Sequence, residues 1–332
     1  MPALVTGATG FLGQYIVEQL VARGERVRAL VRKPTRDLVR LGVETNCGDL
    51  TDRDVVIAAC KGIDTVYHVA GVAGIWGPWE HFHSINTRGT QHVIEGCLRH
   101  RVARLVYTSS PSVTFDGGDQ AGIDEQTPYP DRWLCHYPHT KALAEQLVLA
   151  AHDSGLLATC SLRPHLIWGP RDRHLIPRLI ERARAGQLRR VGNGENLIDM
   201  VYVENAAEAH LLAADALAKP DCPAGGKAYF ITQGEPVNCW KWIDELLALA
   251  NLPPVRKSIS LRTAWMAGAA LEGVYRLMRW NNEPRMTRFL AAQLGRHHYF
   301  DISAARRDLG YSPRVSTAEG MERLKQSLVT RS

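Results

Sequence analysis

The chain has 332 residues, 45% of them hydrophobic and 22% charged, which is enough to bury a large core in one large or two closely joined domains. The formal net charge is +6, but the Lys and Arg residues are scattered and never form a basic block with interleaved aromatics, which argues against a nucleic-acid partner. Seven cysteines at irregular spacings, with no C-x-x-C pair, are typical of reduced thiols. We therefore expect a cytoplasmic protein without a metal site.

The sequence offers no segment that would insert in a membrane. MPALVTGATG runs directly into a strand and a glycine turn, leaving no room for a signal peptide, and no apolar run reaches about 18 residues. The nearest approach is residues 263–280, TAWMAGAALEGVYRLMRW, which Glu272, Arg276 and Arg279 make amphipathic. This pattern favours a helix that covers the core, and contact with a membrane surface is the alternative.

Strand and helix patterns alternate regularly over the first half of the chain. Such alternation predicts a Rossmann-type, doubly wound parallel sheet in an NADP-binding domain at residues 1–163. Long helices are predicted over residues 80–100 and 138–153. The expected strands are residues 3–6, 27–32, 43–47, 65–70, 105–109 and 159–163.

The regular alternation ends after residue 163. Helices are predicted at residues 177–186 and 204–217, and strands at residues 198–203 and 227–232. Ser316 and Glu319 form a capping-box pattern at the start of a terminal helix. Residues 164–332 are therefore expected to form a smaller mixed α/β lobe that binds substrate, with some segments returning to the first sheet.

A glycine-rich turn follows the first expected strand. In TGATGFLG, Gly7, Gly10 and Gly13 lie three residues apart and a helix begins near Phe11. A strand, a glycine turn and a helix N-terminus bring backbone N–H groups and the positive end of the helix dipole together, as a pyrophosphate requires. The spacing is G-x-x-G-x-x-G, which meets the dinucleotide fingerprint G-x-G-x-x-G only approximately. We expect the cofactor to contact Gly7, Thr9, Gly10, Phe11 and Leu12.

The end of the second strand indicates which dinucleotide binds. An acidic residue that would hold the ribose 2′-hydroxyl of NAD is expected there, but the chain has Arg32 and then Lys33. A guanidinium pairs well with a 2′-phosphate, so we predict NADP(H) in preference to NAD(H). Further cofactor contacts are expected after the third and fourth strands, at Asp49, Leu50, Ala70 and Gly71.

The stretch HYPHTK contains the candidate acid–base pair. Tyr137 and Lys141 are four residues apart, so they share one face if the stretch is helical. Ser109 and Ser110 end the fifth strand, on the side where open parallel sheets bind ligands. Hydride arriving at a carbonyl carbon places negative charge on oxygen, which needs a donor and then a proton.

These side chains have distinct expected roles. A nearby Lys141 cation is expected to lower the pKa of the Tyr137 phenol from its ordinary value of about 10. Ser110 would orient the carbonyl by hydrogen bonding. Asn86 is expected to support the lysine through its backbone or a water, although a lone Asn is more often a structural residue of its helix.

Six motifs together resemble the extended short-chain dehydrogenases/reductases over nearly the whole chain: TGATGFLG, GDL, YTSS, YPHTK, LRPHLIWGP and DMVYVENAAEAH. The resemblance implies that Ser110, Tyr137 and Lys141 are catalytic. It also implies that Pro164, His165 and Ile167 contact the nicotinamide, and that the protein forms a homodimer through its two long helices.

Within this family, four further phrases resemble the 3β-hydroxysteroid dehydrogenase branch: YTSSPSVTF, AGIWGPWEHF, PRLIERARAG and GKAYFITQGEP. They are most similar to bacterial reductases of 2-alkyl-3-oxoalkanoates in olefin biosynthesis. The resemblance implies an oxidoreductase that interconverts a ketone and a secondary alcohol at the 3-position of a bulky hydrophobic substrate. Arg32 favours the NADPH-linked reductase, and a 3β-hydroxysteroid or sterol dehydrogenase is the alternative.

Some residues are candidates for contact with that substrate. Trp76 and Trp79, with Phe82, follow the fourth strand and could form apolar walls, although core packing explains each one almost as well. Arg171, Arg173 or His174 is the candidate for holding the carboxylate of a β-keto acid, and a plain surface charge is the alternative.

Two other functions compete with this interpretation. A sugar-nucleotide epimerase or dehydratase shares the fold, but such dehydratases place carboxylates after the catalytic Ser, where this chain has Pro111 and Ser112. Epimerases of the family commonly place an arginine before the aspartate of a D-x-V strand, and this chain has NLIDMVYV. A non-catalytic NADP(H)-sensing module would need only the glycine turn, but such proteins typically lose the Tyr or the Lys.

Overall fold

Seven parallel strands form the central sheet of the computed structural model, which describes residues 2–329. Their order is β12-β7-β5-β4-β1-β2-β3. The chain builds the sheet outward from β1 to β3 on one side and then continues from β4 on the other side of β1, as in a doubly wound fold. The predicted fold class is therefore confirmed. The strands are β1 (Pro2–Thr6), β2 (Arg26–Val31), β3 (Glu44–Cys47), β4 (Thr65–His68), β5 (Arg104–Thr108), β7 (Ala158–Pro164) and β12 (Lys227–Ile231).

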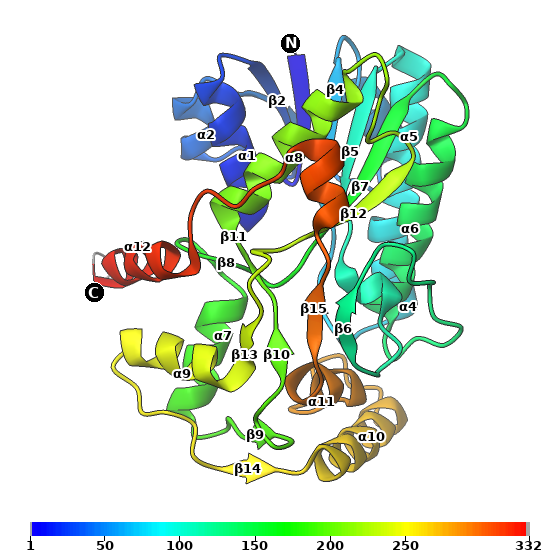
Figure 1. Ribbon diagram of the computed structural model, residues 1–332. Coiled ribbons are helices and arrows are strands. Elements are labelled where there is room, and N and C mark those ends of the chain that lie inside the picture. Colours follow the sequence, from blue (N-terminus) through cyan, green and yellow to red (C-terminus); the bar gives the residue numbers. More distant parts are fainter. Residues whose placement is uncertain (1, 330–332) are drawn as a thin grey trace.

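Helices cover both faces of this sheet (Figure 1). One face packs against α1 and α8, and the other against α3, α5 and α6. These helices are α1 (Phe11–Ala22), α3 (Arg53–Ala59), α5 (Gly89–His100), α6 (His136–His152) and α8 (Val203–Leu217), and the short α2 (Arg36–Arg40) precedes β3. The helix expected at residues 80–100 is continuous but divided into α4 (Trp79–Phe82), a π-helical turn η1 (His83–Arg88) and α5.

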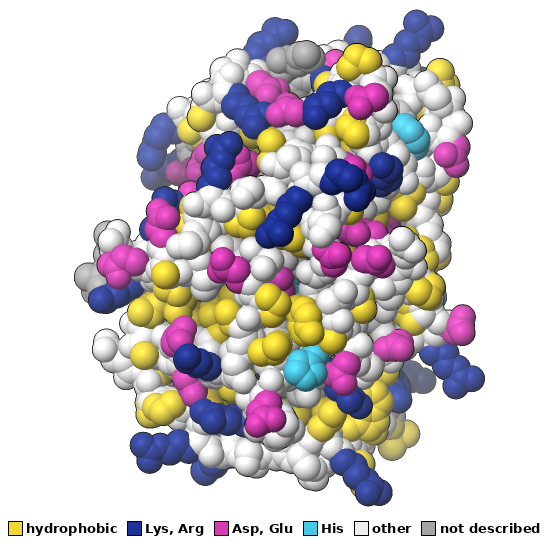
Figure 2. All heavy atoms as spheres, in the orientation of Figure 1, with side chains coloured by type: hydrophobic (Ala, Val, Ile, Leu, Met, Phe, Trp, Pro, Cys, Tyr) yellow, Lys and Arg dark blue, Asp and Glu magenta, His cyan; other side chains and the backbone are white. Residues whose placement is uncertain are grey.

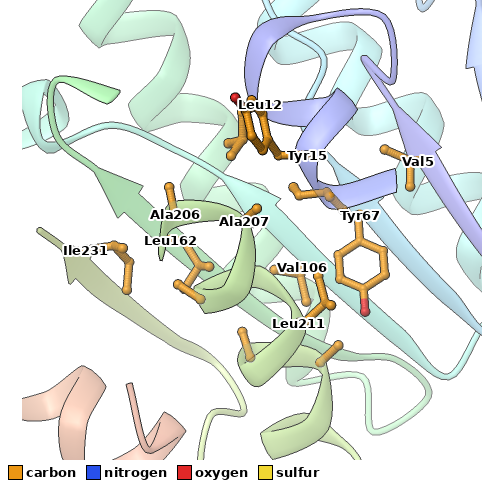
Figure 3. Close-up of a cluster of buried hydrophobic side chains, with 14 of the residues drawn as sticks. Val5, Leu12, Tyr15, Tyr67, Val106, Leu162, Ala206, Ala207, Leu211 and Ile231 are labelled. Carbon is orange, nitrogen blue, oxygen red and sulfur yellow. The ribbon is translucent and has the colours of Figure 1, made fainter. Parts of the chain in front are cut away.

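The larger core lies between the sheet and the helices α1 and α8 (Figure 3). Leu12 and Tyr15 from α1 meet Ala206, Ala207 and Leu211 from α8 above the strands. The many alanines of α8 allow a close approach to the sheet, because short side chains bring the helix axis near the strands. β12, from the second half of the chain, completes this sheet beside β7.

The lower half of the molecule in Figure 1 consists of shorter elements. Its sheets are β13-β10-β15-β6, β11-β8 and β14-β9. The strands are β6 (Gln120–Ile123), β8 (Ile167–Trp168), β9 (Arg190–Val191), β10 (Leu197–Ile198), β11 (Val201–Tyr202), β13 (Val237–Asn238), β14 (Ser258–Ile259) and β15 (His298–Phe300). The remaining helices are α7 (Leu175–Arg184), α9 (Cys239–Leu249), α10 (Leu261–Leu277), α11 (Arg288–Gly295), α12 (Thr317–Val329) and the turn η2 (Pro111–Thr114). The turn η3 (Ala305–Leu309) lies in the upper half of Figure 1 instead, where it packs against α8 and β12.

Two local predictions need correction. The single strand expected at residues 198–203 is broken, because the buried Asp199 side chain accepts hydrogen bonds from Met200 N (2.9 Å) and Thr232 Oγ1 (2.6 Å) and turns the chain between β10 and β11. The capping box at α12 is only half formed. Ser316 Oγ accepts from Glu319 N (3.2 Å), but the Glu319 carboxylate pairs with Arg323 (2.7 Å).

The amphipathic pattern expected for residues 263–280 is also different in the structure. α10 buries only a narrow stripe, Ala264, Gly268 and Glu272, against α11, so it covers the core with one edge alone. Glu272 lies on this buried face and accepts from Arg288 Nη2 at 2.8 Å. No helix within residues 2–329 is long and apolar enough to cross a membrane.

A buried ion pair fixes α6 to the sheet. Glu145 is fully buried on α6, and its carboxylate accepts hydrogen bonds from Arg163 of β7, with Nη2 at 2.6 Å and Nε at 3.1 Å. Ser161 Oγ (2.7 Å) and Tyr129 Oη (2.8 Å) donate to the same carboxylate. Burial alone would raise the pKa of Glu145, but the charge and hydrogen bonds of Arg163 outweigh it and lower that pKa.

Replacing Glu145 with Ala leaves the Arg163 charge buried without its counter-charge, so we expect the free energy of unfolding to fall by about 3–5 kcal/mol. Urea unfolding followed by circular dichroism measures this change. Glu95→Ala is the matched control, because its pair with Arg53 lies on the surface and should contribute much less. Equal losses in the two variants would contradict a structural role for the buried pair.

Candidate functional site

The glycine turn between β1 and α1 requires glycine at two positions. Gly7 has φ +73°, and a Cβ there would lie 2.7 Å from Ala70 N. A Cβ at Gly13 would lie 2.1 Å from Gly7 O, so only glycine lets α1 start this close to the turn. The N–H groups of Phe11 and Leu12 lie in the first turn of α1, where a helix provides no internal partner. These donors and the open turn fit a dinucleotide pyrophosphate, as the sequence predicts.

A buried polar network beneath this turn was missed by sequence reasoning. Thr6 Oγ1 lies 2.7 Å from His68 Nδ1 and accepts from Ala70 N at 3.2 Å. His68 Nε2 lies 2.9 Å from Thr90 Oγ1, which donates to Asn86 O at 2.6 Å. Burial, with a smaller effect of Lys141, lowers the pKa of His68 to about 3, so this ring is neutral. The sequence alone showed only that His68 ends a strand, which does not reveal a buried hydrogen-bond network.

Asn86 connects the segment after β4 to α6. Its Oδ1 accepts from Val72 N (2.8 Å), and its Nδ2 donates to Val72 O and to Thr140 Oγ1, each at 3.1 Å. A Cβ at Gly71 would lie 3.2 Å from Asn86 Oδ1 and 3.8 Å from Lys141 Nζ. Asn86 therefore acts through its side chain on Val72 and α6, and not through its backbone on the lysine.

Ser110 and Tyr137 line the same small cavity. It has a volume of about 190 Å³ and lies at the carboxyl end of β5 and β7, where Pro164 and His165 also line it. Ser110 Oγ lies 2.9 Å from Ser112 Oγ and accepts from Ser112 N at 3.3 Å. None of the residues that line this cavity is charged. They are Gly74, Ile75, Ser110, Pro111, Ser112, Gln120, Tyr137, Pro164, His165, Leu166, Phe289, Gln293 and Phe300.

Lys141 lies one helical turn beyond Tyr137 on α6 and is buried. Its Nζ donates to Thr108 O at 2.5 Å and lies 4.2 Å from the centre of the Tyr107 ring. Burial lowers the pKa of Lys141 to about 7, although Glu145 partly counters this effect. A buried cation near Gly71 fits a role in holding a polar group of the cofactor.

The expectation that Lys141 lowers the pKa of Tyr137 is wrong for this chain. Burial raises the pKa of the Tyr137 phenol, a hydrogen bond with Ser110 partly offsets the rise, and Lys141 is not among the causes. The physical reason is that the Lys141 side chain points toward β5 and not toward the phenol. Its ammonium donates to the Thr108 carbonyl and lies over the Tyr107 ring. The phenol is therefore protonated in neutral solution, ready to donate.

The residues expected around the adenosine lie in different environments. Arg32 and Lys33 are exposed just after β2. Asp49 Oδ1 accepts hydrogen bonds from the backbone N and the Oγ1 of Thr51. The hydrogen bond from Thr51 N is the main cause that lowers the pKa of Asp49, and the charge of Arg32 adds a smaller effect. Leu50 is buried against α5, and its carbonyl oxygen lies 2.9 Å from His92 Nδ1.

Pro164, His165 and Leu166 form one wall of the small cavity, whereas Ile167 does not line it and pairs with Val201 in the β8–β11 sheet. Leu166 has φ +41°, an uncommon conformation for a branched residue, and it turns the chain between β7 and β8. His165 Nδ1 lies 2.5 Å from Asp199 O, and a carbonyl can only accept, so Nδ1 carries the proton and Nε2 is an acceptor. Burial, followed by the neighbouring His298, holds the pKa of His165 well below its usual value, so this ring is neutral.

The expected substrate residues are not brought together. Trp76 lines a second cavity of about 480 Å³, and its Nε1 donates to Trp280 O at 3.0 Å. Trp79 stacks on His83, with ring centres 5.1 Å apart, and supports the start of α6. Arg171 lines a third cavity, of about 380 Å³, which shares no lining residue with the other two. Its guanidinium donates to Glu18 (2.5 and 2.8 Å) and lies over the Tyr15 ring, so it does not reach the cavity of Ser110 and Tyr137.

The sequence matches a known family and two named reductases over most of its length. The model of the 3-beta hydroxysteroid dehydrogenase/isomerase family matches residues 4–261. The chain is 48% identical to the 2-alkyl-3-oxoalkanoate reductase of Stenotrophomonas maltophilia, covering 98% of this chain and 99% of that protein. The reductase of the same name from Shewanella oneidensis is 47% identical, covering 98% of this chain and 86% of that protein.

More distant relatives have related names. The sterol-4-alpha-carboxylate 3-dehydrogenase (decarboxylating) of Mus musculus is 37% identical, covering 97% of this chain and 90% of that protein. A solved structure of MoeE5 in complex with UDP-glucose and NAD has a TM-score of 0.77 and 26% identity, covering 100% of this chain and 99% of that chain.

The family match covers most of the sequence, and the relatives extend it to nearly the full length. The family and the names of the relatives indicate an oxidoreductase of the extended short-chain type that depends on a nicotinamide cofactor. The chain therefore belongs to the 3-beta hydroxysteroid dehydrogenase/isomerase family.

Proposed function

We propose that the protein is an NADPH-dependent reductase of 2-alkyl-3-oxoalkanoates. The observation that carries this proposal is the uncharged cavity beside Ser110 and Tyr137. A nucleotide sugar brings a diphosphate, which needs cations nearby, whereas an alkyl ketone needs apolar walls and one or two hydrogen-bond donors. The two reductases that share 47–48% identity over nearly the full chain support the same substrate class.

The names of the relatives indicate a shared chemical unit. In a sterol-4α-carboxylate oxidised at carbon 3 and in a 2-alkyl-3-oxoalkanoate, a carboxylate is borne by the carbon next to the reacting carbon. We infer that this chain recognises the same unit, with neutral donors such as Gln293 and Ser112 meeting the carboxylate. Long alkyl arms would extend past Ile75, which lines both the small and the large cavity.

In the proposed mechanism the cofactor supplies a hydride to the ketone carbon. Ser110 donates a hydrogen bond to the ketone oxygen, and the Tyr137 phenol gives that oxygen a proton. The raised pKa of Tyr137 keeps the phenol protonated, which suits reduction better than oxidation. Lys141 would hold the ribose, and Arg32 with Lys33 would pair with a 2′-phosphate. We also expect the protein to be cytoplasmic and to form homodimers.

Turnover of a substrate panel tests this function. With NADPH, we expect a 2-alkyl-3-oxoalkanoate to be reduced efficiently, a 3-oxosteroid poorly and UDP-glucose not to be epimerised. Tyr137→Phe should lower kcat by at least about 100-fold and leave NADPH affinity nearly unchanged, because only the proton donor is lost. Efficient reduction of the steroid alone would favour a sterol dehydrogenase, and full activity of Tyr137→Phe would remove the phenol from the mechanism.

Replacing Arg32 with Ala tests cofactor choice. Loss of a charge-assisted hydrogen bond should weaken NADPH binding by about 10-fold to 100-fold and leave NADH binding unchanged, as measured by fluorescence titration. Arg26→Ala is the matched control, because Arg26 is an exposed cation at the opposite end of the same strand. Equal weakening of both cofactors by Arg32→Ala would contradict recognition of the 2′-phosphate.

The pH dependence of turnover tests the link between Ser110 and Tyr137. Oxidation of the alcohol needs the phenolate and should rise with pH, whereas reduction needs the phenol and should fall only in alkaline solution. Because the hydrogen bond with Ser110 lowers the pKa of Tyr137, Ser110→Ala should move both limbs to higher pH. Profiles of kcat against pH in both directions measure this shift, and unchanged limbs would show that the two hydroxyls are not coupled.

A further inference from the structure

Large hydrophobic side chains are exposed together on one segment of the chain. Five of them lie between residues 266 and 280, in α10 and the turn that follows it. Their exposed fractions are 61% for Met266, 48% for Val274, 82% for Leu277, 53% for Met278 and 46% for Trp280. In Figure 2, hydrophobic side chains gather over the position of α10 at the lower right, with Lys and Arg side chains beside them. Within residues 2–329 only Val39, Leu98 and Leu156 are comparable, and they lie far apart in the sequence.

These side chains share one face of α10. Met266, Ala270, Gly273, Val274 and Leu277 follow the spacing i, i+4, i+7, i+8 and i+11, and all five are exposed. The opposite stripe packs against α11, as described above. A surface helix of a protein surrounded by water normally turns its apolar face inward. This outward apolar face therefore indicates a partner, and α10 lies at the end of the molecule farthest from the N-terminus in Figure 1.

The charges around this face select the kind of partner. Arg262, Arg276 and Arg279 are exposed, while the only acidic residue between positions 261 and 282, Glu272, is buried and pairs with Arg288 at 2.8 Å and more loosely with Arg276 at 3.4 Å. Arg279 has φ +54° at the position after the helix where glycine is usual, and no residue in the described range 2–329 forms an ion pair with it. A two-fold contact between copies would set arginines against arginines with no carboxylate between them, so charge disfavours a second copy.

We propose that this surface, made of residues 266–280 and called the α10 surface, docks onto an anionic lipid bilayer. Met266, Val274 and Leu277 enter the boundary of the acyl chains, and Arg276 and Arg279 lie at the level of the anionic headgroups. The indole of Trp280 suits the same interfacial level. No helix crosses the bilayer in this arrangement, because only one face of α10 is buried by lipid.

The large cavity opens beside this surface. Tyr275, Arg276, Arg279 and Trp280 line it, and Ile75 separates it from the cavity of Ser110 and Tyr137. The α10 surface would therefore place the cavity mouth against the bilayer, where molecules with long alkyl chains partition. This use of the surface rests on the proposed function, but lipid binding itself does not.

Co-sedimentation of the full chain with lipid vesicles tests the proposal without an activity assay. The purified protein should bind vesicles of phosphatidylcholine mixed with phosphatidylglycerol at least about tenfold more tightly than vesicles of phosphatidylcholine alone, and added salt should weaken the binding. The double variant Met266→Glu/Leu277→Glu should lose about 100-fold in affinity, because it removes inserted apolar groups and adds two repelled charges.

The matched control is Val39→Glu/Leu156→Glu, which changes two similarly exposed hydrophobic residues elsewhere and should bind vesicles like the unmodified protein.

Light scattering of the same variants gives the second measurement, the oligomeric state. Absence of binding to both kinds of vesicle overturns the proposal. So does conversion of a dimer to a monomer by Met266→Glu/Leu277→Glu, which would make the face a contact between copies. Equal losses in the test and control variants overturn it as well. If the oxo acid is reduced but no vesicle is bound, the docking surface fails while the proposed function stands.

Discussion

The buried pair of Glu145 and Arg163 is the interaction on which the site depends. It joins α6 to β7, and α6 carries Tyr137 and Lys141 while β7 leads into Pro164 and His165. A charge taken out of water is tolerated only with its counter-charge and further hydrogen bonds, so the pair fixes the helix on the strand in one register. Movement of α6 by one turn would separate the phenol from Ser110 and the ammonium from Thr108.

Around this anchor the site is built from two polar clusters and one uncharged cavity. Thr6, His68 and Thr90 connect the glycine turn to η1, and Asn86 connects η1 to α6. The two ends of a dinucleotide would thus be held by one connected framework. Because the pKa of Tyr137 is raised by burial and only partly offset by Ser110, the acid form is favoured, which agrees with a reductase.

The cavity beside Ser110 has an uncharged lining, which bears on the proposed substrate. The MoeE5 structure shares the architecture, yet the cavity beside Ser110 here contains no residue that could pair with a diphosphate. The larger cavity next to it combines aromatic rings with arginines, and α10 contributes Glu272, Tyr275 and Arg276 to its lining. Architecture is therefore shared with the MoeE5 structure, and a shared fold does not by itself identify the substrate.

The sequence by itself determined the alternation of strands and helices expected of a parallel sheet, the glycine turn and the one-turn spacing of Tyr137 and Lys141, because these depend on local periodicity and on residues close in the chain. Only the tertiary structure decided which way a side chain points. It directs Lys141 to Thr108 and Arg171 to Glu18, and it neutralises His68 by burial. It also turns the apolar face of α10 outward, because Gly268 and Glu272 make closer contacts with α11 than Met266 or Leu277 could. Such outcomes depend on burial or on partners that lie between 16 and 153 residues apart in the chain, and neither can be read from local pattern.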